Sequence, residues 1–202
     1  MNDMNKELPI VYLARHGDTA WSVTGQHTGL TDLPLTERGE QVARRLGKRL
    51  QGVTFTKVFT SPLLRARRTC ELAGFGDVAG IDPDLVEWNY GEYEGRRGED
   101  IRVERPGWQL FRDGCPGGES PQQVVARADR VIGRVRSVNA DVLLFSSGHF
   151  IRMFVSRWLG LEPSPNARCF MLSTASLSAV GYENDLSRPV IRLWNDTHHV
   201  AA

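Results

Sequence analysis

The sequence has little excess charge of either sign and no long hydrophobic run. Its 202 residues include 25 Lys and Arg and 24 Asp and Glu, so the formal net charge is +1. Binding to nucleic acid or to an anionic membrane needs a large surface of one sign, and we expect neither as a partner. The polar residues 1–9 and the short apolar run after them do not match a signal peptide or a membrane-spanning helix. We therefore expect a cytoplasmic protein.

Cysteines are few and widely separated. Cys70, Cys115 and Cys169 form no Cys-x-x-Cys pair, and no histidines stand at zinc-ligand spacing. We therefore expect reduced thiols, no metal site and no bound cofactor. Internal repeats are also absent, and a chain of this length can form one substantial core. The prediction is one domain over residues 1–202, with loose tails at 1–8 and 196–202, and a homodimer is left open.

Segments typical of strands alternate with segments typical of helices. Buried strands are predicted at 9–14, 57–60, 142–146, 176–182 and 189–194. Helices are predicted at 36–50, 61–73, 120–138 and 150–159. Thr36 and Ser61-Pro62 are predicted caps, and Ser120 begins a capping box. The alternation predicts a single three-layer α/β/α domain with a mainly parallel central sheet.

Three of the predicted strands are followed directly by residues suited to bind an anion. Arg15 and His16 follow the first strand, the segment 61–65 follows the second, and the segment 147–149 follows the third. The carboxyl ends of parallel strands meet at one edge of a sheet, where ligands bind. A guanidinium matches two phosphate oxygens, and a neutral imidazole can attack phosphorus. The sequence therefore predicts a phosphate site at this edge, although an Arg-His pair alone also occurs by chance.

These segments resemble, in order, the motifs of the histidine phosphatase superfamily, the phosphoglycerate mutase-like group. The matching residues are Arg15-His16-Gly17-x-Thr19, Thr60-Ser61-Pro62-x-x-Arg65-Ala66-x-x-Thr69, Glu87-x-x-Tyr90-Gly91-x-x-Glu94-Gly95 and Gly148-His149-Phe150-Ile151-Arg152. Segments 21–36 and 112–119 resemble the branch that includes the fungal sedoheptulose-1,7-bisphosphatase and related bacterial acid phosphatases. The resemblance implies a phosphoglycerate mutase-like fold.

The resemblance also implies catalytic roles. His16 would attack phosphorus and form a phosphohistidine, while Arg15 and Arg65 would hold the phosphoryl oxygens. Glu87 would protonate the leaving alkoxide and then deprotonate the attacking water. That role needs a raised pKa, which burial or the neighbouring carboxylates Glu92 and Glu94 would provide.

Further residues are candidates for phosphate or substrate binding. For Trp88 and Tyr90, a position in the core or in the pocket wall is as consistent with the sequence as contact with the substrate. Arg152 is suited to bind a distal phosphate of the substrate. The full set is Ser22, Thr28, Gly29, Trp88, Tyr90, Ser147, Gly148, His149 and Arg152.

One position departs from the family pattern. Ser147 stands where a second histidine is expected, and it brings a hydrogen-bond donor without positive charge. Loss of one transition-state donor costs about 2.7 to 4 kcal/mol. His149 either rotates in to replace the histidine expected at position 147 or only packs at the start of its helix. We expect the second, because side chains at two neighbouring positions leave the backbone in different directions and rarely exchange roles.

The expected function is hydrolysis of a small phosphorylated metabolite, such as a sugar phosphate, through a phosphohistidine on His16. Two alternatives stay open. One is a phosphoglycerate mutase that needs 2,3-bisphosphoglycerate as cofactor; the residues after Glu87, Trp88-Asn89-Tyr90, lack the histidine expected of the mutases. The other is a phosphate-binding or regulatory homologue whose turnover is low because of Ser147.

Overall fold

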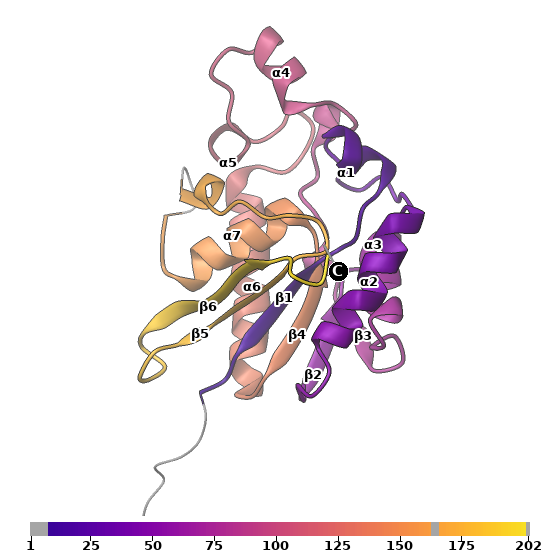
Figure 1. The fold of residues 1–202 in the computed structure, drawn as a ribbon. Coiled ribbons are helices and arrows are strands. Elements are labelled where there is room, and N and C mark those ends of the chain that lie inside the picture. The colour runs from indigo at the N-terminus through magenta and orange to yellow at the C-terminus, as the bar shows by residue number, and fades with distance from the viewer. Residues whose placement is uncertain (1–7, 163–165, 201–202) are drawn as a thin grey trace, which may run out of the picture.

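The computed structural model describes residues 8–162 and 166–200 (Figure 1). Six strands form one sheet in the order β3-β2-β4-β1-β5-β6. Their bounds are β1 Val11–Arg15, β2 Lys57–Thr60, β3 Ala79–Ile81, β4 Val142–Ser146, β5 Leu177–Tyr182 and β6 Pro189–Asp196. β3, β2, β4 and β1 are parallel, whereas β5 runs antiparallel to β1 and β6 antiparallel to β5. The prediction of a mainly parallel sheet is confirmed.

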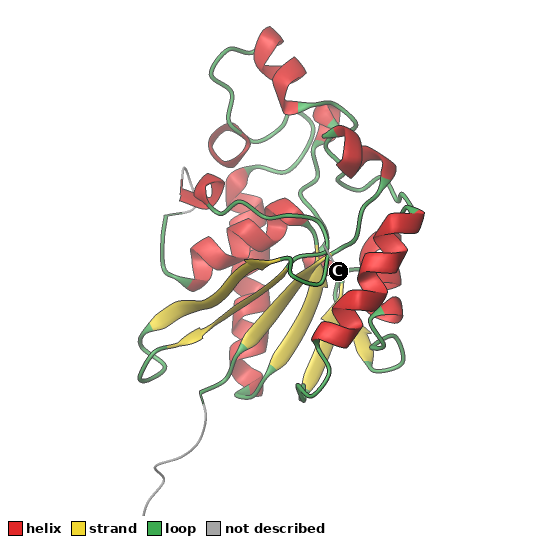
Figure 2. Cartoon of the chain, viewed as in Figure 1, coloured by secondary structure: helices red, strands yellow, loops and turns green. Residues whose placement is uncertain are grey.

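Helices cover both faces of the sheet (Figure 2). The long helices are α2 Glu37–Arg49, α3 Leu64–Leu72, α6 Pro121–Val138 and α7 Gly148–Trp158. Successive side chains of β4 point to opposite faces of the sheet, so this strand contributes to a hydrophobic cluster on each face. Leu144 belongs to the cluster that includes residues of α6 and α7, and Leu143 to the cluster with Leu46 of α2 and Cys70 of α3. The three-layer α/β/α prediction is therefore confirmed.

Short elements cover the carboxyl ends of the strands (Figure 1). They are α1 Ala20–Thr24, the 3-10 turns η1 Pro83–Leu85 and η2 Gly91–Tyr93, α4 Gly98–Glu104, α5 Leu110–Asp113 and the 3-10 turn η3 Ala167–Cys169. Buried aromatic side chains pack this region, with the rings of Tyr93 and Trp108 edge to face at 5.3 Å. These elements cover the edge of the sheet at which β1 ends, with Arg15 as its last residue.

The start of α3 differs from the prediction. The helix begins at Leu64 rather than at Ser61-Pro62, and Leu63 at its N-cap makes no side-chain capping bond. The Ser61 hydroxyl instead accepts the N–H of Leu63 at 3.3 Å. The N–H of Leu64 donates to the Asp32 carboxylate at 2.6 Å. The cap therefore comes from a residue distant in the sequence, which the local pattern could not indicate.

The predicted C-terminal tail is wrong for residues 196–200. His199 is only 7% exposed, and its Nε2 lies 2.8 Å from the carbonyl oxygen of Ala175. At the other end, Leu8 packs against the core. The rest of both predicted tails, residues 1–7 and 201–202, lies outside the described residues.

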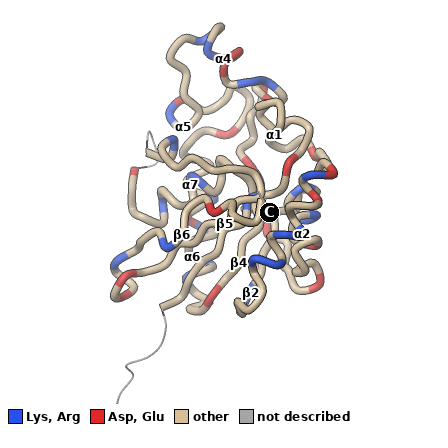
Figure 3. The backbone as a smooth tube through the Cα atoms, in the orientation of Figure 1, with Lys and Arg blue, Asp and Glu red and all other residues tan. Residues whose placement is uncertain are grey.

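Charge is mixed over the chain, as its composition predicts. Basic and acidic residues are interspersed in the view of Figure 3. No helix within the described residues is long and apolar enough to cross a membrane.

Candidate active site

His16 lies directly after β1 and is only 3% exposed. Its backbone N–H donates to the carbonyl of Ser146 at 3.1 Å, and its Nδ1 lies 2.8 Å from the carbonyl oxygen of Gly17. A carbonyl oxygen only accepts, so Nδ1 carries the proton and Nε2 keeps a free lone pair. Burial, and then the positive charges of Arg65 and Arg15, hold the pKa of His16 well below its usual value. The imidazole is therefore a neutral nucleophile.

Gly17 is required by the close approach of α2. A Cβ at this position would lie 2.6 Å from the carbonyl oxygen of Gly39. The Gly17 N–H donates to the hydroxyl of Thr69 at 3.1 Å, and that hydroxyl donates to the carbonyl of Arg65 at 2.7 Å. These bonds tie the loop after β1 to the helix that carries Arg65.

The guanidinium of Arg65 is fully buried. Its Nη2 donates to the carbonyl oxygens of Thr28 and Gly29 at 2.9 and 2.7 Å, and its Nη1 to that of Thr31 at 3.1 Å. Its Nε is buried and has no partner among the described residues. Arg65 therefore both anchors the loop 28–31 and keeps one donor unused.

Gly29 does not line the pocket as predicted. A Cβ there would lie 2.6 Å from the carbonyl oxygen of Trp88, because two chain segments meet at this point. Its N–H donates to the carboxylate of Glu94 at 2.7 Å. Glu94 is therefore engaged by this loop, rather than placed as a neighbour that acts on Glu87, and Gly29 positions Arg65.

Arg15 is held against the start of α7. Its Nη1 donates to the carbonyl of Leu172 at 2.5 Å, while its Nε is buried without a partner in the described part of the chain. A Cβ at Gly148 would lie 3.1 Å from the guanidinium carbon of Arg15. Gly148 therefore leaves room for the arginine side chain, where a larger residue would collide with it.

Glu87 is 4% exposed and lies at the first turn of α7. Its Oε1 accepts the N–H groups of Trp88 and Phe150 at 2.9 and 2.8 Å, and its Oε2 accepts the N–H of His149 at 2.9 Å. Hydrogen bonds from N–H groups stabilise a charged carboxylate and fix its orientation. The geometry thus places the predicted proton-transfer group beside the pocket by backbone contacts alone.

Ser147 is the N-cap residue of α7, yet its hydroxyl makes no capping bond. The side chain is fully buried, and its Oγ has no hydrogen-bond partner within residues 8–162 and 166–200. His149 does more than pack at the helix start, contrary to the expectation. Its Nδ1 lies 2.5 Å from the hydroxyl of Tyr90, and its ring lines the pocket next to Arg15 and His16.

Trp88 and Tyr90 have different surroundings although they are two residues apart. The indole of Trp88 is fully buried, donates to the carbonyl of Glu119 at 2.9 Å and packs edge to face on Phe111. Trp88 is therefore a core residue, and its prediction as a substrate contact is wrong. Tyr90 does line the pocket.

The pocket is a cavity of about 170 Å³ at the carboxyl end of β1. It brings together seven of the predicted residues: Arg15, His16, Ser22, Thr28, Glu87, Tyr90 and His149. Three residues that the sequence analysis missed complete the lining: Gly25, Gln26 and His27. The ring of His27 stacks on Tyr90 at 4.5 Å, and burial, then the charge of Arg102, lowers the pKa of His27 to about 4. The sequence feature that could have pointed to His27 is its position within segment 21–36, which resembles the family.

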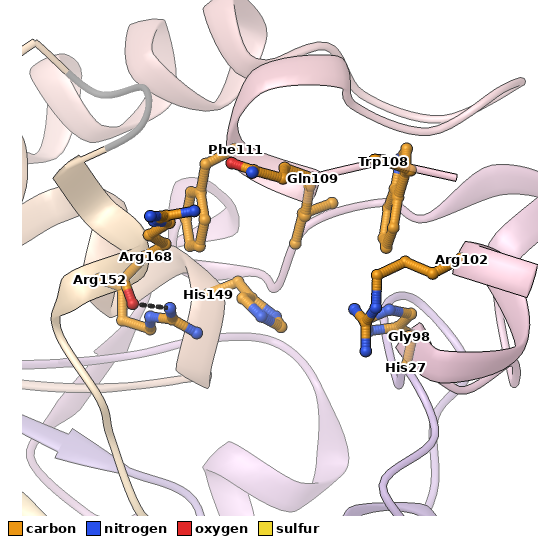
Figure 4. A pocket seen from close by; sticks show the side chains of 11 residues that line it. His27, Gly98, Arg102, Trp108, Gln109, Phe111, His149, Arg152 and Arg168 are labelled. Atoms are coloured by element: carbon orange, nitrogen blue, oxygen red, sulfur yellow. Dashed lines mark hydrogen bonds between the residues drawn. The ribbon is translucent and has the colours of Figure 1, made fainter. Parts of the chain in front are cut away.

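Arg152 lies in the wall of a neighbouring cavity instead (Figure 4). Its Nε and Nη2 donate to the carbonyls of Ala167 and Arg168 at 3.2 and 2.8 Å. Among the described residues, no group of three or more His, Cys, Asp or Glu side chains is arranged to hold a metal ion.

Comparisons with known proteins agree with this geometry. The profile of the histidine phosphatase superfamily (branch 1) matches residues 11–197. Sedoheptulose 1,7-bisphosphatase of Saccharomyces cerevisiae is 38% identical over 186 residues, covering 76% of this chain and 68% of the relative. An acid phosphatase of Mycobacterium tuberculosis is 39% identical over 178 residues, covering 85% and 86%. The solved structure of the Mycobacterium tuberculosis open reading frame Rv3214 has a TM-score of 0.88 and 36% identity, covering 94% of this chain and 98% of that one. The chain belongs to the histidine phosphatase superfamily, branch 1.

Proposed function

We propose that the chain hydrolyses a small phosphomonoester by transferring the phosphoryl group first to Nε2 of His16 and then to water. One observation carries the proposal. Six buried side-chain nitrogen or oxygen atoms lack a hydrogen-bond partner in the described part of the chain, and Arg15 Nε, Arg65 Nε and Ser147 Oγ are three of them. Unpartnered buried polar groups are costly and rare. Of these three residues Arg15 lines the cavity beside His16, and the proposal is that phosphoryl oxygens held there accept from all three.

Each step of the reaction has a group to perform it. The lone pair of His16 Nε2 attacks phosphorus while the bond to the leaving oxygen breaks, and that oxygen takes a proton from the carboxyl of Glu87. Water then attacks the phosphohistidine and gives its proton to Glu87. Phosphate leaves, and His16 is again neutral.

The substrate class follows from the pocket and the relatives. A 170 Å³ cavity fits a phosphoryl group with a small part of its ester. One relative is named as a sugar bisphosphatase and another as an acid phosphatase. The proposal is a phosphoric monoester hydrolase acting on sugar phosphates or similar metabolites, without a cofactor and without a nucleic-acid partner. It places the chain in the cytoplasm and does not depend on a homodimer.

The test is phosphate release from a panel of sugar phosphates, with His16→Ala as the control. Wild type is expected to turn over at least one substrate and to carry acid-labile phosphate on His16, detected as a mass shift during turnover. Equal rates for wild type and His16→Ala would refute the assignment of the nucleophile.

Ser147 favours one second candidate, a phosphate-binding protein with low turnover. A single hydrogen-bond donor without charge stabilises a developing phosphoryl charge less than an imidazolium does. Tight phosphate binding with negligible hydrolysis, and turnover gained by Ser147→His, would select this function.

A further inference from the structure

A second cavity, of about 380 Å³, adjoins the phosphoryl pocket (Figure 4). His27 and His149 line both cavities, so the wall between them consists of two imidazole rings. The ring centroids of these two histidines are 5.8 Å apart. The second cavity therefore adjoins the place where the leaving group of a phosphoryl ester bound at His16 begins.

The lining of this cavity contains three arginines and no acidic residue: Arg102 of α4, Arg152 of α7 and Arg168 of η3. Arg102 and Arg168 are exposed, and neither makes an ion pair or donates a side-chain hydrogen bond to another described residue. Arg152 uses Nε and Nη2 on carbonyl oxygens, so its Nη1 is not engaged. Unpaired guanidinium groups around an acid-free cavity favour an anionic occupant.

The rest of the lining is flat and apolar. Trp108 and Phe111 stand on opposite sides of the cavity in Figure 4, and Leu110 lies in the same lining. The guanidinium carbon of Arg152 lies 4.8 Å from the ring centroid of Phe111, so the cation and the ring share one wall. Gln109 contributes the one uncharged amide side chain among the residues that line the cavity. An open-chain polyol would find few partners for its hydroxyl groups here, whereas a ring would fit both walls.

We propose that this cavity binds the leaving group of the substrate, and that this leaving group is a flat, apolar body carrying its own anionic group, of the class of an aromatic carboxylate. Arg102 and Arg168, on opposite sides of the cavity in Figure 4, supply the positive potential that attracts the anion, and the rings of Trp108 and Phe111 flank the body. His27, which lines both cavities and whose buried Nε2 has no partner among the described residues, lies beside this leaving group. The inference rests on the proposed phosphatase function and, among phosphomonoesters, favours this class over the sugar phosphates as the substrate of the same site.

The test compares two phosphate esters of similar shape, 4-carboxyphenyl phosphate and 4-carbamoylphenyl phosphate, whose para substituents are an anionic carboxylate and an uncharged amide. We expect kcat/KM to favour the carboxylate, and the double variant Arg102→Gln/Arg168→Gln to reduce that preference by about tenfold or more, because hydrogen bonds to charged groups are the stronger ones. Comparing the ratio in the two proteins cancels the different reactivity of the two esters. Arg67→Gln, at an exposed arginine of α3, is the matched control and should leave the ratio unchanged.

A binding experiment separates this inference from the proposed function. His16→Ala is titrated with both esters by calorimetry, with and without the double substitution. If His16→Ala binds the carboxylate ester more tightly than the amide ester, and the double substitution removes this difference, the role of the cavity is supported. If wild type nevertheless hydrolyses neither ester, the proposed function alone fails. An unchanged ratio in both experiments overturns the role of the two arginines. Tighter binding of open-chain 3-phosphoglycerate than of 4-carboxyphenyl phosphate overturns the role of the aromatic walls.

Discussion

Replacing Ser147 by alanine should move activity and stability in opposite directions. The hydroxyl is fully buried and has no hydrogen-bond partner among the described residues. Its removal therefore loses no bond of the resting protein and relieves the desolvation of a polar group. An unsatisfied buried group costs about 1 to 3 kcal/mol, so we expect the free energy of unfolding to rise by about 1 kcal/mol.

Activity should fall, because the hydroxyl acts only when a phosphoryl oxygen is present. A hydrogen bond to a charged group contributes about 1.5 to 3 kcal/mol. If the bond forms fully in the transition state, its loss lowers kcat/KM by about 10- to 150-fold. The same serine is thus expected to destabilise the resting protein and to speed the reaction.

Both quantities are measured on one preparation, by urea denaturation and by phosphate release. Ser156→Ala is the matched control, because Ser156 is also a fully buried serine without a hydrogen-bond partner among the described residues, but lies near the C-terminal end of α7 instead of at its start. It should gain similar stability and keep full activity. Unchanged kcat/KM in Ser147→Ala would refute contact between this hydroxyl and the phosphoryl group. A lower free energy of unfolding in Ser147→Ala would show that the Ser147 hydroxyl has a hydrogen-bond partner in the resting protein.

Two further perturbations test the electrostatics. Because burial and the arginine charges lower the pKa of His16, NMR titration of the free protein should show this imidazole still neutral at pH 6.5, and Arg65→Gln should raise its pKa; an unchanged titration would contradict this. Arg127→Ala should cost about 3 to 5 kcal/mol in urea denaturation, because it leaves the Glu119 carboxylate, 2.8 Å away, without its buried partner. Arg130→Ala, at an exposed guanidinium, should cost at most about 1 kcal/mol, and equal losses would show that burial does not decide the effect.

The layers of the fold were predictable from the sequence, because buried strands and long amphipathic helices leave strong patterns. β4 lies at the predicted residues 142–146, since all five of its side chains are buried. α4 and α5 left no such pattern. They have seven and four residues, and Ile101 and Phe111 hold them by contacts with distant parts of the core. Such contacts are tertiary and cannot be read from local spacing.

The residues of the candidate site likewise fall into those that were predictable from local sequence and those that were not. Arg15 and His16 were predictable, because their roles depend on one strand end. The environment of Glu87 was not, since its carboxylate is held by N–H groups of α7 more than sixty positions along the chain. His27 was missed because it reaches the pocket by stacking on Tyr90. Trp88 was misplaced because no regular element sets which side of this segment faces the core.

The three imidazoles around the phosphoryl pocket share one property that affects how it responds to acid. Burial is the main cause that lowers the pKa of His16 and His149 well below the usual value and that of His27 to about 4. These rings therefore stay uncharged through mildly acidic conditions, and guanidinium groups alone supply the positive potential. The imidazoles therefore add no positive charge to the pocket as the pH falls slightly below neutral. A weakening of binding as the pH falls past about 6 then reports the second protonation of the phosphate ester rather than a change of charge on these imidazoles.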